Sequence, residues 1–143
     1  MGALQITTEG RASATRQIFP TLLSGGTIFR GWARSACGDA AEGLAWIEGA
    51  IEDWMATSTI LWVSYYLALK AEALYLADRT CEALGAINEA EELAERFEDR
   101  HWCAELRRLR AVYFSRRSVQ KRTKLRLRSA QPLESQRSRS RFR

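Results

Sequence analysis

The chain has 143 residues, with 22 Lys and Arg against 17 Asp and Glu, a formal net charge of +5 and three cysteines. This length suits a single domain, and an odd number of widely spaced cysteines argues against a disulfide framework or a cysteine metal site and favours a cytoplasmic location. The longest strongly apolar run, residues 60–69, is too short to span a bilayer, and no signal-peptide pattern opens the chain, so a soluble, unexported protein is expected.

The charge is divided unevenly along the sequence. Residues 1–114 hold 11 Lys and Arg against 16 Asp and Glu, whereas residues 115–143 hold 11 against one. The start of the chain is small and polar without apolar periodicity. We therefore expect residues 1–16 to be a frayed segment or the remnant of a helix cut off upstream. A folded domain should cover residues 17–114, and a basic Arg/Ser-rich tail over residues 115–143 should be disordered or prolong the last helix.

Five helices are predicted along the folded part of the chain. Pro20 suits a first helical turn, and a helix over residues 20–37 follows it. Gly38 ends this helix and Asp39 caps the next, with Glu42 placed to complete a capping box. The second helix carries an apolar stripe of Leu44, Ile47, Ile51 and Trp54 and ends in a short break at residues 56–59.

The third and fourth helices form an antiparallel hairpin over residues 60–97. They are joined by a break at residues 78–80, with Thr80 as the cap of the fourth helix. The third helix is apolar almost all round and should be buried on several sides, whereas the fourth has one apolar side, which includes Phe97, and an otherwise acidic surface.

A fifth helix follows a polar turn at residues 98–100. Its apolar residues are Trp102, Leu106, Leu109, Val112 and Tyr113. This apolar face is wider than one neighbouring helix covers, so we expect self-association that depends on Leu109 and Tyr113.

The sequence repeats itself at a constant offset, which is the signature of a repeat architecture. The small residues Gly31, Ala71 and Ala111 are equally spaced and define this offset. The offset also relates Glu42-Gly43-Leu44 to Glu82-Ala83-Leu84, Ile47 to Ile87, Ala50 to Ala90 and Trp62 to Trp102. Each unit is a helix, a short break and a second helix, and such units bury their apolar faces by stacking. The three small residues fall where helices cross closely, so large side chains should not be tolerated there.

This pattern resembles the tetratricopeptide repeat (TPR). The resemblance lies in the small residue at the middle of each first helix and in the sets Gly43, Ile47, Ala50 and Ala83, Ile87, Ala90 of the second helices. More closely, residues 17–114 resemble the TPR-like C-terminal region of large bacterial signalling proteins that carry a class III adenylate or guanylate cyclase domain or a regulatory ATPase domain. The units are longer than those of the family, which usually have about 34 residues, and they lack its helix-ending proline at Met55 and Glu95.

The resemblance implies an all-α short solenoid of about two and a half units. It also implies a non-catalytic protein–protein interaction scaffold, a fragment of a bacterial signal-transduction protein without its cyclase or ATPase domain. The concave face, built from the first helix of each unit, would bind a protein or peptide, or else be a solvated surface without a dedicated ligand. Its positions are Trp32, Ser35, Tyr65, Glu72, Tyr75, Glu105, Arg108 and Val112. No cofactor is expected.

Other sequence features give little support for chemistry. His101, the only histidine, and Cys103 point in different directions on a helix, so they predict no metal site or nucleophile pair. The glycines after Ser24 lack the preceding strand and the Gly-Lys-Ser/Thr of a phosphate loop.

The basic tail suggests an alternative function. Its cations would bind nucleic-acid phosphates without sequence preference, through Arg116, Arg117, Lys121, Arg122 and Lys124. The tail nevertheless has one aromatic residue and no recognisable fold for reading bases. Its abrupt change of composition is also what a shifted reading frame or a truncated gene would give, and the charge would then be incidental.

Overall fold

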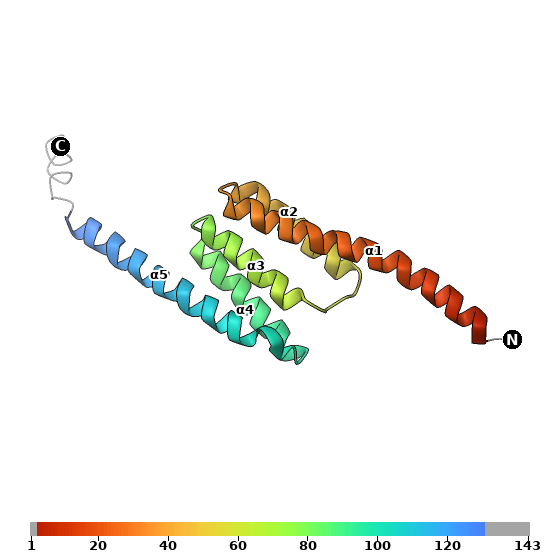
Figure 1. Cartoon of the computed structure of the whole chain (residues 1–143). Coiled ribbons are helices and arrows are strands. Elements are labelled where there is room, and N and C mark those ends of the chain that lie inside the picture. The colour runs from red at the N-terminus through yellow and green to blue at the C-terminus, as the bar shows by residue number, and fades with distance from the viewer. Residues whose placement is uncertain (1–2, 131–143) are drawn as a thin grey trace, which may run out of the picture.

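The computed structural model describes residues 3–130, with side chains from residue 19 to residue 129, and this part of the chain is helical throughout apart from short turns (Figure 1). The elements are α1 (Ala3–Ala36), α2 (Ala40–Ala56), α3 (Val63–Leu76), α4 (Thr80–Arg96), the 3₁₀ helix η1 (Arg100–Trp102) and α5 (Cys103–Ala130). Helices α1 and α2 pack as one antiparallel pair and α3 and α4 as another, and α5 lies against α4 and α3. The predicted all-α fold of five helices is confirmed.

Helix α3 occupies the middle of the bundle. It contacts α1, α2, α4 and α5, whereas the outer parts of α1 and α5 project beyond the bundle at opposite ends (Figure 1). Its buried residues are Val63, Ser64, Tyr66, Leu67, Ala68, Leu69, Ala71, Ala73 and Leu74. The prediction that this helix is buried on several sides is therefore confirmed.

Helix α4 buries one side only, as its sequence predicts. Ala83, Ile87 and Ala90 are fully buried, whereas Glu89 and Glu92 are exposed. Phe97 does not belong to the buried side, because it follows the last helical residue and is 41% exposed.

Two helix starts differ from the predicted ones. Helix α1 begins at Ala3 rather than near Pro20, which lies inside the helix. Residues 3–16 mix good helix formers with three Thr, one Ser and one Gly, so intrinsic propensity alone does not explain this early start. Helix α3 begins at Val63 rather than at residue 60, because Trp62 has a left-handed backbone conformation with a φ of 71°. The expected fraying of residues 1–16 stays a prediction.

Each of the first four α-helices is followed by a residue in the left-handed conformation. The φ angles are 107° at Gly38, 57° at Ser58, 61° at Asp78 and 55° at Glu98. After three of them the next backbone N–H donates to a carbonyl five residues back: Asp39 to Arg34, Arg79 to Leu74 and Asp99 to Ala94, at 3.2, 2.9 and 2.9 Å. These bonds satisfy carbonyls that the helix end leaves free and fix the direction of the next helix.

The predicted N-terminal caps do not form. Asp39 stands at the cap position of α2 but makes no cap hydrogen bond. The carboxylates of Asp39 and Glu42 instead pair with Arg34, at 3.1 and 2.5 Å, and the Asp39 N–H donates to the Arg34 carbonyl at 3.2 Å. Thr80 is the first residue of α4 rather than its cap, and its buried hydroxyl has no hydrogen-bond partner among the described residues. Neither Asp39 nor Thr80 therefore makes the cap hydrogen bond that its position in the sequence suggests.

Small residues mark the close crossings of the two helix pairs. Between α1 and α2, a Cβ added to Gly31 would lie 2.6 Å from the Gly43 carbonyl oxygen and 2.9 Å from Ile47. In the second pair Ala71 is fully buried. Ala111 is exposed, so its predicted place at a close crossing is wrong: no described helix packs on that side of α5.

This difference gives a testable pair of substitutions. Ala71→Leu should lower the free energy of unfolding by about 1–3 kcal/mol, because the added atoms have no space in a packed interior. Ala111→Leu should change it by no more than about 0.5 kcal/mol, as is usual at an exposed helical site. Urea denaturation of both variants tests this, and equal effects would contradict the arrangement of α3 and α5.

Helix α5 is docked more deeply than its sequence suggests. Leu106, Leu109 and Tyr113 are buried, because α3 covers this face together with α4. Leu109 and Tyr113 are therefore not part of an exposed apolar face, and the exposed large apolar residues of this helix are Val112, Phe114, Val119, Leu125 and Leu127. Self-association itself stays a prediction. The tail was predicted to be disordered or to prolong the last helix. In the structure α5 continues through residues 115–130, and residues 131–143 lie outside the described part.

Candidate functional site

A cavity of about 180 Å³ lies between α1, α3 and α5. We call this cavity, together with the Trp62 and Trp102 rings beside it, the groove. Helix α1 contributes Phe29 and Trp32, α3 contributes Tyr65, Ala68, Leu69 and Glu72, and α5 contributes Glu105 and Leu109. Four of these residues, Trp32, Tyr65, Glu72 and Glu105, are among those predicted for the concave face. The structure therefore brings together half of the predicted set in one cavity.

Two hydrogen-bonded pairs order the polar side of the cavity. The Trp32 indole Nε1 donates to Glu72 Oε2 at 2.8 Å, which ties α1 to α3. On α5, Arg108 donates from Nε and Nη2 to the two carboxylate oxygens of Glu105, at 2.8 and 2.6 Å. These hydrogen bonds lower the pKa of Glu105, so its carboxylate is charged at neutral pH.

The other predicted residues lie elsewhere. Ser35 is buried in the crossing of α1 with α2, where its hydroxyl donates to the Gly31 carbonyl at 3.0 Å, so it does not face the groove. Val112 is 42% exposed and lines no part of the cavity. Tyr75 stacks on Tyr113 with ring centroids 4.5 Å apart, one turn beyond Glu72 on α3.

An aromatic strip continues from the cavity toward the start of α5. Tyr65 stacks on Trp102 at 4.2 Å, and Trp102 in turn lies 5.8 Å from Trp62. On the other side Phe29 lies 6.1 Å from Tyr65. Phe29 and Trp62 remain 45% and 42% exposed, so the strip offers apolar surface to a partner as well as packing the helices together.

The sequence interpretation missed the apolar half of the cavity. Phe29, Leu69 and Leu109 follow one another at the same offset that relates Gly31 to Ala71. Phe29 also lies three residues before Trp32, which places both on one helical face. The repeat offset, applied to these positions as well, would have found them.

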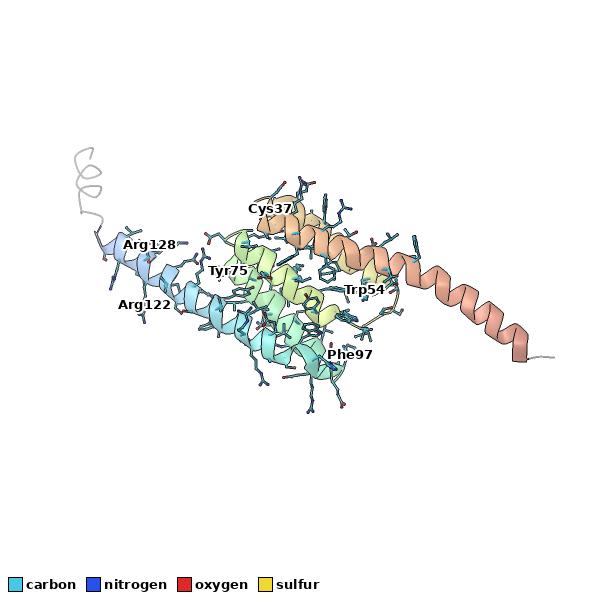
Figure 2. The ribbon with its side chains drawn as sticks, in the orientation of Figure 1. Cys37, Trp54, Tyr75, Phe97, Arg122 and Arg128 are labelled. Carbon is cyan, nitrogen blue, oxygen red and sulfur yellow. The ribbon has the colours of Figure 1, made fainter. Side chains whose placement is uncertain are left out.

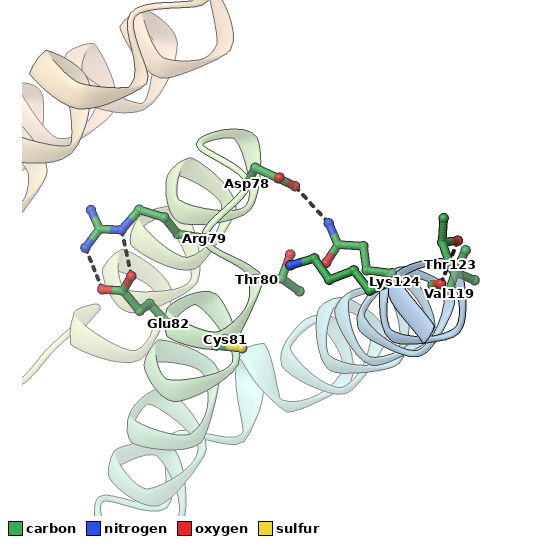
Figure 3. A pocket seen from close by; sticks show the side chains of 9 residues that line it. Asp78, Arg79, Thr80, Cys81, Glu82, Val119, Thr123 and Lys124 are labelled. Carbon is green, nitrogen blue, oxygen red and sulfur yellow. Dashed lines mark hydrogen bonds and ion pairs between the residues drawn. The ribbon is translucent and has the colours of Figure 1, made fainter. Parts of the chain in front are cut away.

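A second cavity, of about 560 Å³, separates the start of α4 from the extension of α5 (Figure 3). Arg79 pairs with Glu82 at 2.5 Å, and Gln120 donates to Asp78 at 2.9 Å. Lys124 also lines this cavity. The lining of this cavity thus holds two cations, Arg79 and Lys124, and two carboxylates, Asp78 and Glu82. These charges balance, so the cavity favours neither an anion nor a cation.

The extension of α5 is the basic surface of the molecule. Residues 115–130 carry seven Lys and Arg and no acidic residue. Arg116 is held at the bundle, with its guanidinium carbon 4.7 Å from the Tyr75 ring centroid. Farther along, Arg122 and Arg128 lie on the part of α5 that projects away from the other helices (Figure 2).

The described residues give no support to metal chemistry. No group of His, Cys, Asp and Glu among them could hold a metal ion. His101 is exposed in η1 and lies 3.3 Å from Asp99, while Cys37 and Cys81 are exposed and unpaired. Within residues 3–130 no helix is long and apolar enough to cross a membrane.

Tyr113 provides a pH-dependent probe of the packing beside the groove. Its hydroxyl is buried and has no partner among the described residues, and this burial, followed by the charge of Glu72, raises its pKa well above the usual value. The unfolded chain loses this proton near pH 10 and the folded chain keeps it, so stability should fall as the pH rises above about 10. Tyr113→Phe should remove this part of the loss.

Urea denaturation at neutral and alkaline pH measures the effect. At neutral pH Tyr113→Phe should change the free energy of unfolding by less than about 1 kcal/mol, because no hydrogen bond is lost. Above pH 10 the variant should become the more stable of the two proteins. Parallel pH profiles would show that Tyr113 is solvated rather than buried.

The chain was compared with protein-family models, with curated protein sequences and with solved structures, and none of the three comparisons found a match.

Proposed function

We propose that this chain is a non-catalytic scaffold that binds a peptide segment of a partner protein in the groove between α1, α3 and α5. The observation that carries the proposal is the lining of the cavity, to which three helices contribute: the exposed ring of Phe29, the half-buried rings of Trp32 and Tyr65, and two carboxylates. Ligand pockets are usually apolar with a few placed polar groups, and bound peptides insert individual side chains into such pockets.

The spacing of the helix ends supports a repeat origin for this groove. The left-handed residues Gly38, Ser58, Asp78 and Glu98 follow one another at equal intervals, and two such intervals make up the repeat offset. Trp32 and the Glu72 that it contacts are separated by the same offset. In a TPR-like array the first helices of successive units form the concave face, which corresponds here to α1, α3 and α5. On this interpretation the chain derives from the repeat region of a bacterial cyclase or regulatory ATPase.

Peptide selection tests the proposed site. Peptides selected from a random library on the immobilised chain should lose affinity by about tenfold or more with Phe29→Ala, because an aromatic anchor at the centre of an interface carries much of the binding energy. Phe114→Ala removes the same side chain from an exposed site outside the groove and should leave binding unchanged. If no peptide binds, or if both variants weaken it equally, the groove is not the site.

The basic extension of α5 favours a second candidate function, nucleic-acid binding. Arg122 and Arg128 lie on the part that projects away from the bundle, whereas Arg116 is held at the bundle by Tyr75 and Asp78. All cations of this extension are exposed apart from the half-buried Arg117. Contacts to phosphates of this kind release counterions, so affinity falls steeply as salt is added.

A salt titration of duplex DNA binding measures this contribution. The slope of log affinity against log salt is negative. The triple variant Lys121→Ala/Arg122→Ala/Lys124→Ala should make it shallower by about 3, because each lost phosphate contact removes about one unit. Arg100→Ala, in η1 at the opposite end of the bundle, should leave the slope unchanged. Binding that is insensitive to salt or to the triple substitution would exclude this function.

A further inference from the structure

The cavity of the groove combines flat aromatic surfaces with negative charge. Phe29 and Trp32 on α1 and Tyr65 on α3 supply the rings, while Ala68, Leu69 and Leu109 make the rest of its apolar lining. Rings of this kind attract cations through the negative charge above their faces, most strongly where water is excluded. The cavity of about 180 Å³ has room for one side-chain head group rather than for a folded element.

The two carboxylates of the cavity are not equally engaged. Both oxygens of Glu105 accept hydrogen bonds from Arg108. Glu72 is half-buried and accepts one hydrogen bond, from Trp32 to Oε2, while Oε1 has no partner among the described residues. Two carboxylates facing one guanidinium leave a net negative charge. A neutral apolar occupant would cover the Glu72 carboxylate without compensating it, which is unfavourable.

We infer that this cavity binds the side chain of an arginine in the partner peptide, with the guanidinium against the aromatic rings and directed at Glu72 Oε1. This inference rests on the proposed peptide-binding function and specifies the chemistry of its ligand. A guanidinium matches the site better than an ammonium, because it is planar, stacks on aromatic faces and is less strongly hydrated. The same features disfavour a phosphate or an acidic peptide at this position.

The test uses the tripeptide amide acetyl-Ala-Arg-Ala-NH₂ and its citrulline analogue, which has the same shape without the charge. The Trp32 indole N–H resonance of the ¹⁵N-labelled full chain, assigned with Trp32→Phe, reports directly on the cavity. The arginine probe should shift this resonance in a saturable way with millimolar affinity, and the citrulline probe should bind at least about tenfold more weakly. Equal shifts by both probes, or no shift with arginine, would overturn the inference.

Charge-matched variants locate the interaction. Glu72→Gln keeps an acceptor for Trp32 and should weaken the arginine probe about tenfold. Glu89→Gln makes the same change of charge on the exposed side of α4 and should have no effect. If Glu89→Gln weakens the probe as much as Glu72→Gln, the attraction is a property of the net charge and the inference fails.

The peptides selected on the whole groove separate this inference from the function on which it rests. If those peptides bind through Phe29 but tolerate citrulline in place of every arginine, the scaffold function stands and the arginine site fails. If the tripeptide binds at Glu72 but no selected peptide depends on Phe29, the arginine site stands without the proposed function.

Discussion

Gly43→Ala is expected to lower the free energy of unfolding by about 3 kcal/mol, at the upper end of the usual range for overpacking a core. The added Cβ would collide with the Ser35 hydroxyl and the Gly31 carbonyl oxygen, and would lie 2.8 Å from the backbone nitrogen of Ser35. Two of these three atoms belong to the backbone of α1, so they move aside only if the helices separate. Separation would in turn expose Ile28 and Ile47, which are fully buried. The gain in helix propensity, about 1 kcal/mol, is too small to compensate.

Gly49→Ala in the same helix is the matched control. No atom lies within 4 Å of a Cβ added there, so only the gain in helix propensity remains and the substitution should stabilise the protein by about 0.5–1 kcal/mol. Urea denaturation should therefore give effects of opposite sign for one and the same change in α2. If Gly43→Ala is also stabilising, α1 and α2 do not cross as closely as the structure shows.

The helices that pack against neighbours were predictable from the number and spacing of their apolar residues. The central helix, with polar side chains only at Ser64, Lys70 and Glu72, is buried on several sides, and Leu84, Ile87 and Ala90 do form the buried side of α4. In these segments burial decides the structure, and the spacing of apolar residues records burial directly.

The helix ends were less predictable, because they depend on single dihedral angles and on competition between nearby charges. Trp62 adopts a left-handed conformation that no property of tryptophan predicts, and this moves the start of α3 from residue 60 to residue 63. Arg34 pairs with Asp39 and Glu42 together, and its carbonyl accepts from the Asp39 N–H that Glu42 would bind in the capping box that their spacing suggests. Only knowledge of the preceding helix reveals this competition.

The groove was predicted in part because its residues follow the repeat offset. Trp32, Tyr65, Glu72 and Glu105 fall on facing turns of α1, α3 and α5. The same reasoning failed for Ser35, since one further turn along α1 brings the chain to the crossing with α2 rather than to the groove. A position in a repeat thus predicts which neighbour a side chain meets only where the same helices lie beside it in every unit.

A substitution at Leu106 tests whether α5 is packed against α3 and α4, because this residue is buried in their contact. Leu106→Ala should lower the free energy of unfolding by about 2–5 kcal/mol, because the side chain is fully buried and its loss leaves a cavity. Since α5 supplies Glu105 and Leu109 to the groove, the variant should also weaken peptide binding there. Urea denaturation gives the change in the free energy of unfolding. The slope of this free energy against urea concentration shows whether α5 unfolds together with the other helices.

Val112→Ala is the control on the same helix. Val112 is 42% exposed, so its truncation should change the free energy of unfolding by no more than about 0.5 kcal/mol. A large difference between the two variants with an unchanged slope would mean that α5 belongs to the cooperative fold. If Leu106→Ala instead costs as little as Val112→Ala, α5 is not held on α3 and α4, and the groove that depends on it does not exist in solution.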